Sequence, residues 1–199
     1  MSKHEVTAAE LIAQLNADPE WVAARQRERA ERDRRKAEWR VAETPLIDEL
    51  RSAGYAVESA WDLVNTSEPY PSALPILLAH ATRAYPAVVK EGIARALAVR
   101  DAKFGWPVLA RQFREETEEC AKDGLAVAIA AIADESLIGE LAALVRDPAN
   151  GSSRVLLLGG LERSSEPEAR ATLAEMKDDP DLNREVRAIE KRARRRRAT

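Results

Sequence analysis

Residues 106–132 read WPVLARQFREETEECAKDGLAVAIAAI, and this stretch contains two helical patterns joined by a charged turn. The first half carries apolar side chains at the i, i+3, i+4, i+7 spacing of one helix face: Trp106, Leu109, Ala110 and Phe113. The second half repeats helical spacing 16 residues later: Leu125, Ala128 and Ile129. The stretch therefore predicts a hairpin of two helices, which we call the first and second helix.

The same hairpin recurs every 32 residues without an insertion. One apolar column marks the first helices: Leu77, Leu109, Leu141 and Leu173. Another marks the second helices: Ile93, Leu125, Leu157 and Ile189. Turn-forming residues fall between the two helices of three copies: Pro86, Asn150-Gly151 and Asp179-Pro180. A fixed period of this length is the signature of repeat proteins, in which each unit buries its apolar face against the next.

The period divides most of the chain into four hairpins, at approximately 71–100, 101–133, 134–163 and 164–197, within a repeat region of 71–199. The fourth copy is polar at positions where earlier copies are apolar: Arg170, Lys177 and Arg192 replace Leu74, Ala81 and Ala96. A terminal repeat has no further neighbour, so a polar outer face is expected there. Ser165 with Glu168 predicts a capping box that opens the fourth first helix.

Residues 45–70 fit the same period as a degenerate fifth copy. Three apolar residues fall on second-helix positions: Val57, Trp61 and Val64. Leu46, Ile47 and Leu50 form a plausible preceding helix, and Gly54 could terminate it. Trp61 is expected to be a core residue in this arrangement.

Hairpins of this length, with a second helix such as Lys90-Glu91-Gly92-Ile93-Ala94-Arg95-Ala96-Leu97-Ala98, resemble HEAT-like repeats. The resemblance covers roughly 71–197. It implies an all-α fold, a right-handed α-solenoid of four to five HEAT-like helical hairpins with an N-terminal helical extension. Known members of this family include scaffolds, DNA-alkylation repair glycosylases and phycobiliprotein chromophore lyases. The resemblance identifies an architecture, because fold alone does not choose among these functions.

Composition agrees with a helical protein of the reducing cytoplasm. The chain is 45% hydrophobic but only 5% aromatic, and its net charge of −3 argues against a dedicated nucleic-acid binder. A single cysteine, Cys120, excludes an intrachain disulfide. Residues 1–5 do not begin an apolar stretch of signal-peptide length, and no run of 18 apolar residues occurs, so a soluble protein without membrane contact is expected.

The N-terminal extension, residues 1–44, is predicted to hold two helices. Thr7 and Glu10 form a capping box before Leu11, Ile12 and Leu15, which should dock on another surface. Asp18-Pro19 then opens a highly charged helix that ends near Ala42 and is supported by i,i+4 pairs: Glu28 with Arg32 and Glu31 with Arg35. Its alanines at seven-residue spacing, Ala23, Ala30 and Ala37, leave self-association through this helix as an alternative.

No catalytic constellation, metal site or cofactor motif is found. His4 and His80 are the only histidines, and Cys120 lies at a helix N-terminus that could lower its pKa but lacks a histidine base. Gly159-Gly160 is better explained by close helix packing than by phosphate binding. Trp61 with Asp62 is the nearest, and a poor, candidate for a glycosylase-like pair.

The second helices are expected to line the concave, ligand-binding side. Projected at about 100° per residue, their faces opposite the core column carry Glu91, Arg95 and Ala98, then Asp123, Val127 and Ala130, then Val155, Leu158 and Gly159. The second and third of these helices are apolar nearly all round, so either another part of the chain or a partner should cover them. Lys90, Lys122 and Arg154 recur at 32 residues as a basic ladder, although Lys90 could instead pair with Asp123.

Two classes of function remain. The first is a non-enzymatic protein–protein interaction module or scaffold that binds a protein or peptide on this face. The alternative is a nucleic-acid-binding HEAT-like protein that uses the basic ladder and the C-terminal run Arg194, Arg195, Arg196 and Arg197. A HEAT-fold DNA glycosylase or chromophore lyase is the weakest alternative, because no charged or aromatic pocket can be assembled from the sequence.

Overall fold

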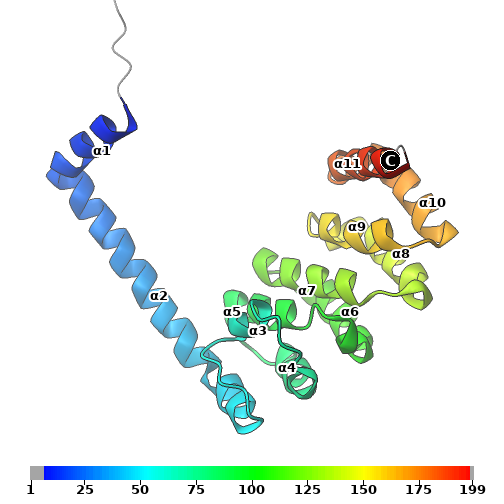
Figure 1. Ribbon diagram of the computed structural model, residues 1–199, viewed down its shortest axis with the longest axis horizontal. Helices are drawn as coiled ribbons and strands as arrows, with labels where there is room; N and C mark the ends of the chain where they lie inside the picture. Colours follow the sequence, from blue (N-terminus) through cyan, green and yellow to red (C-terminus); the bar gives the residue numbers. More distant parts are fainter. Residues whose placement is uncertain (1–6, 198–199) are drawn as a thin grey trace, which may run out of the picture. The chain divides into compact units, whose positions relative to one another are not determined.

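The computed structural model describes residues 7–197, without the side chains of residues 9, 10, 13, 14 and 197, so His4 lies outside the described residues. The described residues form helices and turns, with no strand among them. The chain divides into two compact units, Met1–Val41 and Ala42–Thr199, which are considered separately below (Figure 1). The prediction of an all-α protein is confirmed.

The first unit contains α1 (Ala8–Ala17) and the beginning of α2 (Pro19–Ser52). Asp18 opens α2 as predicted, because its Oδ1 accepts hydrogen bonds from the backbone N–H groups of Glu20 (2.9 Å) and Trp21 (3.3 Å). Leu11 and Ile12 on α1 are 51% and 55% exposed. The first unit therefore does not itself bury these two side chains of α1.

Ion pairs along one turn support the charged part of α2. Glu31 Oε1 lies 2.7 Å from Arg34 Nη2 and 3.1 Å from Arg35 Nε, so the predicted pair with Arg35 is confirmed. Arg34 also reaches Glu38 at 2.6 Å. These contacts are local and exposed, and they stabilise the helix only modestly.

The predicted helix end near Ala42 is wrong, since α2 continues through Pro45 to Ser52. Proline removes one backbone donor and crowds the preceding turn, which normally disfavours a helix interior. Here the turns after Pro45 bury Leu46, Ile47 and Leu50, which are at most 5% exposed. Burial of these side chains offsets the local cost, and the helix ends just before Gly54, whose φ of +94° suits glycine.

The second unit continues with α3 (Ala60–Val64) and then four pairs of helices. The first helices of the pairs are α4 (Leu74–Ala81), α6 (Trp106–Glu115), α8 (Ile138–Arg146) and α10 (Pro167–Glu175). The second helices are α5 (Ala87–Ala96), α7 (Glu119–Ile132), α9 (Arg154–Arg163) and α11 (Asn183–Arg197). Short 3-10 turns join them: Pro71–Ala73, Arg100–Gly105, Glu135–Leu137, Pro148–Asn150 and Met176–Asp178.

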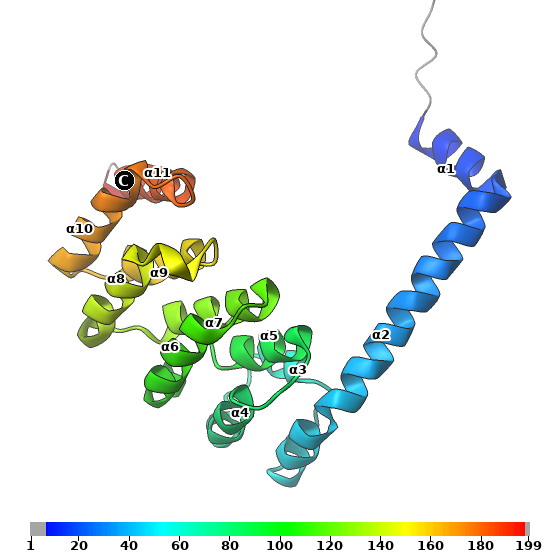
Figure 2. The ribbon, with the colours of Figure 1, turned by 180° about the vertical axis from the view of Figure 1, so that it is seen from behind.

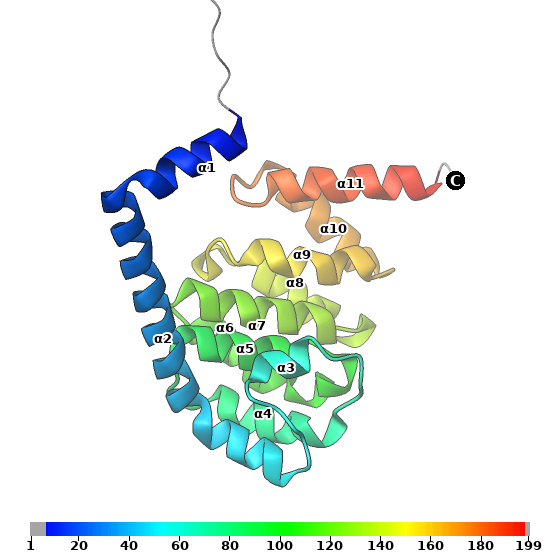
Figure 3. The same cartoon turned by 60° about the vertical axis from the view of Figure 1, so that its left-hand side comes forward.

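The second helices of this unit contact one another in chain order, from α3 through α5, α7 and α9 to α11 (Figure 3). The first helices lie on the other side of this layer, and α4, α6 and α8 each pack on the second helix that follows (Figure 2). Both predicted columns are in the interior: Leu77, Leu109 and Leu141 are fully buried, and Ile93, Leu125, Leu157 and Ile189 are at most 5% exposed. Leu173, in the last pair, is only half-buried.

Glycines set the close spacing of the second helices. A Cβ atom on Gly124 of α7 would lie 2.9 Å from the Cα of Glu91 on α5. A Cβ atom on Gly160 of α9 would lie 3.2 Å from the carbonyl oxygen of Ala130 on α7 and 2.6 Å from Leu141 Cδ2 on α8, which agrees with a packing role for Gly160. At Gly159 the nearest side-chain atom, on Arg163, would be 3.6 Å away, so this position is open.

The predicted capping box of Ser165 and Glu168 is wrong. Helix α10 begins at Pro167, and the N–H of Glu166 donates to Ser164 Oγ at 3.1 Å. Glu168 instead binds Arg146 at 2.7 Å. The capping box that does form opens α3, where Ser59 and Asp62 exchange hydrogen bonds with the backbone.

Candidate functional site: the outer face of the second helices

The outer face of the second helices is the strip of half-buried side chains that α5, α7 and α9 turn away from the first helices. Among the predicted binding residues, five lie on it: Glu91, Arg95, Asp123, Val127 and Val155. Each of these five side chains is partly buried. The strip therefore combines two valines with charged neighbours across three successive helices.

Arg95 is held in place at one end of the strip. Its Nε donates to Glu91 Oε1 at 2.8 Å, one helical turn earlier. Its guanidinium lies over the ring of Trp61, 5.9 Å from the centroid. The indole packs on α5 where Gly92 leaves room, since a Cβ atom there would lie 2.8 Å from Trp61 Nε1. Trp61 is half-buried, so it supports Arg95 rather than filling the core as predicted.

The basic ladder does not form as a surface feature. Lys90 Nζ pairs with Glu116 Oε2 at 2.8 Å, not with Asp123 as predicted. Lys122 Nζ donates to the carbonyl of Glu116 at 3.2 Å and lies over the ring of Phe113. Burial raises the pKa of Glu116, but the hydrogen bonds from Lys90 and from backbone N–H groups outweigh it, so the pKa is lowered overall. Lys90 thus links two neighbouring hairpins, whereas Lys122 contacts residues of its own hairpin.

Arg154, the third rung of the ladder, is buried, with a side chain only 2% exposed. Its Nη1 donates to the carbonyl of Val145 at 3.1 Å and to Asp179 Oδ2 at 3.0 Å. Its Nη2 reaches Asp181 at 3.4 Å. Arg154 therefore joins the third and fourth pairs of helices, and its prediction as a partner-binding residue is wrong.

Leu158 and Ala130 are also interior, at 0% and 5% exposure, although the projection placed them on the outer face. These positions were expected to be exposed on the assumption that each second helix buries only one of its sides. Helix α7 contacts three helices, α5, α6 and α9, and α9 contacts four, α7, α8, α10 and α11. Each of the two helices is therefore buried on more than one side. Neighbouring second helices account for the apolar surface that an additional cover was expected to hide.

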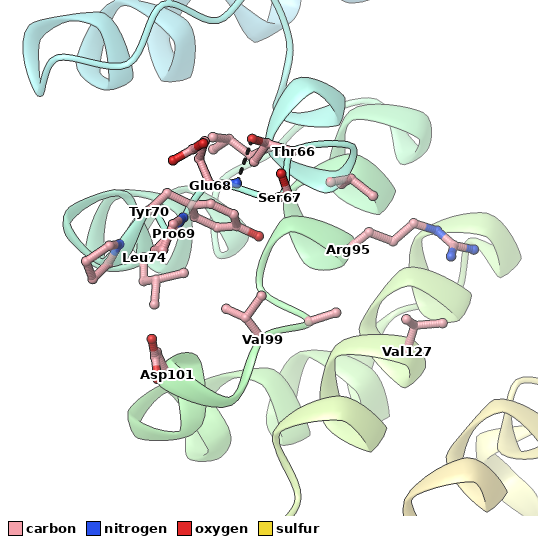
Figure 4. A pocket seen from close by; sticks show the side chains of 14 residues that line it. Thr66, Ser67, Glu68, Pro69, Tyr70, Leu74, Arg95, Val99, Asp101 and Val127 are labelled. Carbon is pink, nitrogen blue, oxygen red and sulfur yellow. Dashed lines mark hydrogen bonds between the residues drawn. The ribbon is translucent and has the colours of Figure 1, made fainter.

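A pocket of about 370 Å³ opens beside the strip (Figure 4). Its walls come from the segment between α3 and α4, from the end of α5 and from Val127 on α7. Tyr70 stands in one wall and donates its hydroxyl to the carbonyl of Ala96 at 2.9 Å, and burial raises its pKa. Arg95 and Val127 lie at the side nearest the strip. The periodicity did not indicate this pocket, because its loop falls between two repeats.

The residues nearest to catalytic chemistry make structural contacts. Asp62 Oδ2 accepts from the backbone N–H groups of Glu58 (2.8 Å) and Ser59 (3.1 Å), so it caps α3. Burial and the nearby carboxylate of Glu91 raise the pKa of Cys120 to about 11, opposite to the lowering that a helix N-terminus could produce. Cys120 is thus a protonated thiol at neutral pH.

His80 is fully buried, with contacts to α2 and to the turn between α4 and α5. Its Nδ1 shares a hydrogen bond with the Tyr85 hydroxyl at 2.6 Å, and its Nε2 lies 3.1 Å from Glu49 Oε1. Within residues 7–197, no group of three or more histidine, cysteine, aspartate or glutamate side chains is placed to hold a metal ion.

The C-terminal arginines lie along α11. Arg194 approaches Glu190 at 3.9 Å and Arg196 approaches Glu162 at 3.8 Å. Arg195 is exposed. The side chain of Arg197 lies outside the described residues.

Comparisons of the chain with models of protein families, with curated proteins and with solved structures find no match. In the part of the chain that the structure describes, no helix has the length and apolar character needed to cross a membrane.

Proposed function

We propose that this protein is a right-handed α-solenoid of four to five HEAT-like hairpins that serves as a non-enzymatic protein-interaction module in the cytoplasm. Its partner, a protein or peptide, would bind the outer face of α5, α7 and α9. One observation carries the proposal: Val127 and Val155 are only partly buried and have charged residues near them on the same and adjacent helices, next to a pocket whose wall includes Val127.

The strip has the composition of a small protein interface. Such interfaces place apolar groups at the centre and charged or polar groups at the rim. Here the valines are flanked by Glu91 and Arg95 on one side and by Asp123 on the same helix as Val127. Arg95 is already held by Glu91 and Trp61, so little side-chain entropy is lost when a partner contacts it.

The pocket would receive one anchoring side chain of the partner. Its volume of about 370 Å³ falls at the small end of the range of ligand pockets. Apolar walls are supplied by Leu63, Leu74, Val99 and Val127. A partner segment crossing Val155 and Val127 would reach the pocket beside Arg95, which predicts an apolar anchor flanked by an acidic residue.

Two further points favour binding over catalysis. Asp62 and Cys120, the residues nearest to a catalytic role, are respectively a helix cap and a thiol whose pKa is raised. The nucleic-acid alternative loses its basic ladder, because Lys90 and Arg154 are paired within the protein.

The test is affinity capture with the wild-type protein and with Val127→Glu plus Val155→Glu, followed by affinity measurement with each captured partner in purified form. A carboxylate placed at the centre of an interface loses hydration without gaining a pair, so binding should weaken by at least about tenfold. The matched control is Val41→Glu plus Ala143→Glu, which adds the same charge at exposed positions on α2 and α8.

The circular dichroism spectrum and melting temperature must show that both variants are folded. If every purified partner binds the folded Val127→Glu plus Val155→Glu variant as tightly as the wild type, the proposed face is wrong.

A further inference from the structure

The outward face of α11 is a stripe of positive charge. Its members are exposed and share one side of the helix: Arg184, Arg187, Lys191, Arg194 and Arg195. At about 100° per residue they span roughly a third of the helix circumference, opposite the buried Val186 and Ile189. No acidic residue of α11 falls within this sector, since Glu185 and Glu190 lie at its sides. We call this surface the α11 stripe.

Helix stability does not explain the whole stripe. Basic residues near a helix C-terminus interact favourably with the helix dipole, which accounts for Arg194 and Arg195. Arg184 lies in the first turn, where the dipole favours negative charge instead, and Arg187 and Lys191 lie in the middle of the helix, outside its last turn. The helix dipole therefore does not account for these three cations.

Pairing within the protein does not explain it either. Arg192, beside the stripe, is neutralised because it binds Glu162 and Glu185 at 2.8 Å each. By contrast, none of the described carboxylates lies within 4.0 Å of Arg184, Arg187 or Lys191. Three of the five cations are therefore available to an external anion.

We propose that the α11 stripe binds the phosphate backbone of double-stranded nucleic acid, without sequence preference. From Arg184 to Arg195 the stripe runs about 16 Å along a rigid helix, which suits a row of phosphates. Four of its five members are arginines, whose guanidinium forks bind phosphate oxygens in pairs. Contacts of this kind fix position without reading bases.

Other anionic partners fit the stripe less well. A membrane-binding helix inserts large apolar side chains, whereas Val186 and Ile189 of α11 are buried in the protein. A protein interface has an apolar centre, and the stripe has none. The surface lies on α11, apart from the strip on α5, α7 and α9, so this inference stands independently of the proposed function.

The test is fluorescence anisotropy of a labelled 25-base-pair duplex with the full-length protein over a range of salt concentrations. Contacts with the three available cations predict a slope of log K against log salt of about −2.7, which should fall close to zero when these three are removed. Arg184→Ala, Arg187→Ala and Lys191→Ala together should remove three and weaken binding at about 50 mM salt by at least tenfold.

The matched control replaces three exposed cations elsewhere, Arg32, Lys36 and Arg111, with alanine and leaves the net charge the same as in the test variant. Its affinity for the duplex should stay within about twofold of the wild type. Equal losses in both variants would show a non-specific charge effect and overturn the proposal.

Two further probes separate the alternatives. Vesicles with about a third anionic lipid, and polyglutamate of similar length, should compete for the stripe at least tenfold less well than the duplex. The proposal fails if the duplex produces no anisotropy change at about 50 mM salt, or if either probe binds as tightly as the duplex.

Discussion

Helices α2 and α7 are both well formed, yet they are stabilised in opposite ways. The exposed part of α2 is charged nearly all round and is supported by pairs within the helix, such as Glu31 with Arg34. Helix α7 is apolar nearly all round and is buried by α5, α6 and α9 on three sides. The comparison shows that the same secondary structure can depend on local ion pairs in one unit and on tertiary packing in the other.

The largest expected effect is in α7. Ile129→Ala removes a fully buried side chain from α7, which packs against three other helices, and it should lower the free energy of unfolding by about 2–5 kcal/mol. Chemical denaturation measures this change. Val41→Ala, at a position 74% exposed on α2, is the control and should stay within about 0.5 kcal/mol of the wild type. Equal losses of unfolding free energy in Ile129→Ala and Val41→Ala would contradict the difference in stabilisation between α7 and α2.

An intermediate loss of stability is expected for substitution of Arg154, a charged residue that is buried in the second unit. Arg154→Met keeps the length of the side chain but leaves the carbonyl of Val145 without its hydrogen bond. The loss should be about 1–3 kcal/mol by chemical denaturation at pH 7.

The ion pair between Arg154 and Asp179 makes the free energy of unfolding depend on pH. Burial raises the pKa of Asp179, but the hydrogen bond from Arg154 and backbone N–H groups lower it overall. A carboxyl whose pKa is depressed by folding adds stability above its unfolded pKa, near 4, and loses that stability as the pH falls through its folded pKa. Arg154→Met should therefore flatten the acid limb of the stability profile below about pH 4. An unchanged acid limb would show that this pair does not contribute.

The smallest effect is expected in α2. Glu31→Gln removes the carboxylate shared by Arg34 and Arg35, whose side-chain hydrogen bonds hold the pKa of Glu31 below its usual value. The melting temperature of the packed unit should not change. Amide hydrogen exchange in α2 should become faster at low salt, and the difference should vanish at about 1 M salt because the pair is exposed. A fall in the melting temperature would show that α2 is more than locally stabilised.

Much of the fold could be predicted from periodicity. The two apolar columns, the turns at Pro86, Gly151 and Pro180, and the packing role of Gly160 follow from helical spacing and local turn chemistry. Two predicted helix boundaries were wrong, each for a physical reason. Pro45 lies inside α2 because the burial of Leu46 and Leu50 outweighs its local penalty. Glu166 takes the N-cap position of α10, and the Ser165 hydroxyl donates to Glu135 instead of capping the helix.

The candidate site was predicted only in part. Glu91, Arg95, Asp123, Val127 and Val155 lie on the outer face, whereas Arg154 and Leu158 are interior. A projection along one helix cannot tell which of two apolar sides meets a neighbour and which meets solvent. The pocket beside Tyr70 depends on a loop between repeats, and the repeat pattern carries no information on it.

The sequence by itself determined the helical class, the 32-residue period and the residues of the buried columns, because apolar spacing and turn residues act over a few residues of chain. Only the tertiary structure decided which charged side chains form ion pairs within the protein and which remain available to a partner. Lys90 and Arg154 are neutralised by Glu116 and Asp179, which lie 26 and 25 residues further along the chain. Pairing at that distance depends on how the helices pack. It separates the basic ladder, where Lys90 and Arg154 are paired, from the α11 stripe, where Arg184, Arg187 and Lys191 have no carboxylate partner among the described residues.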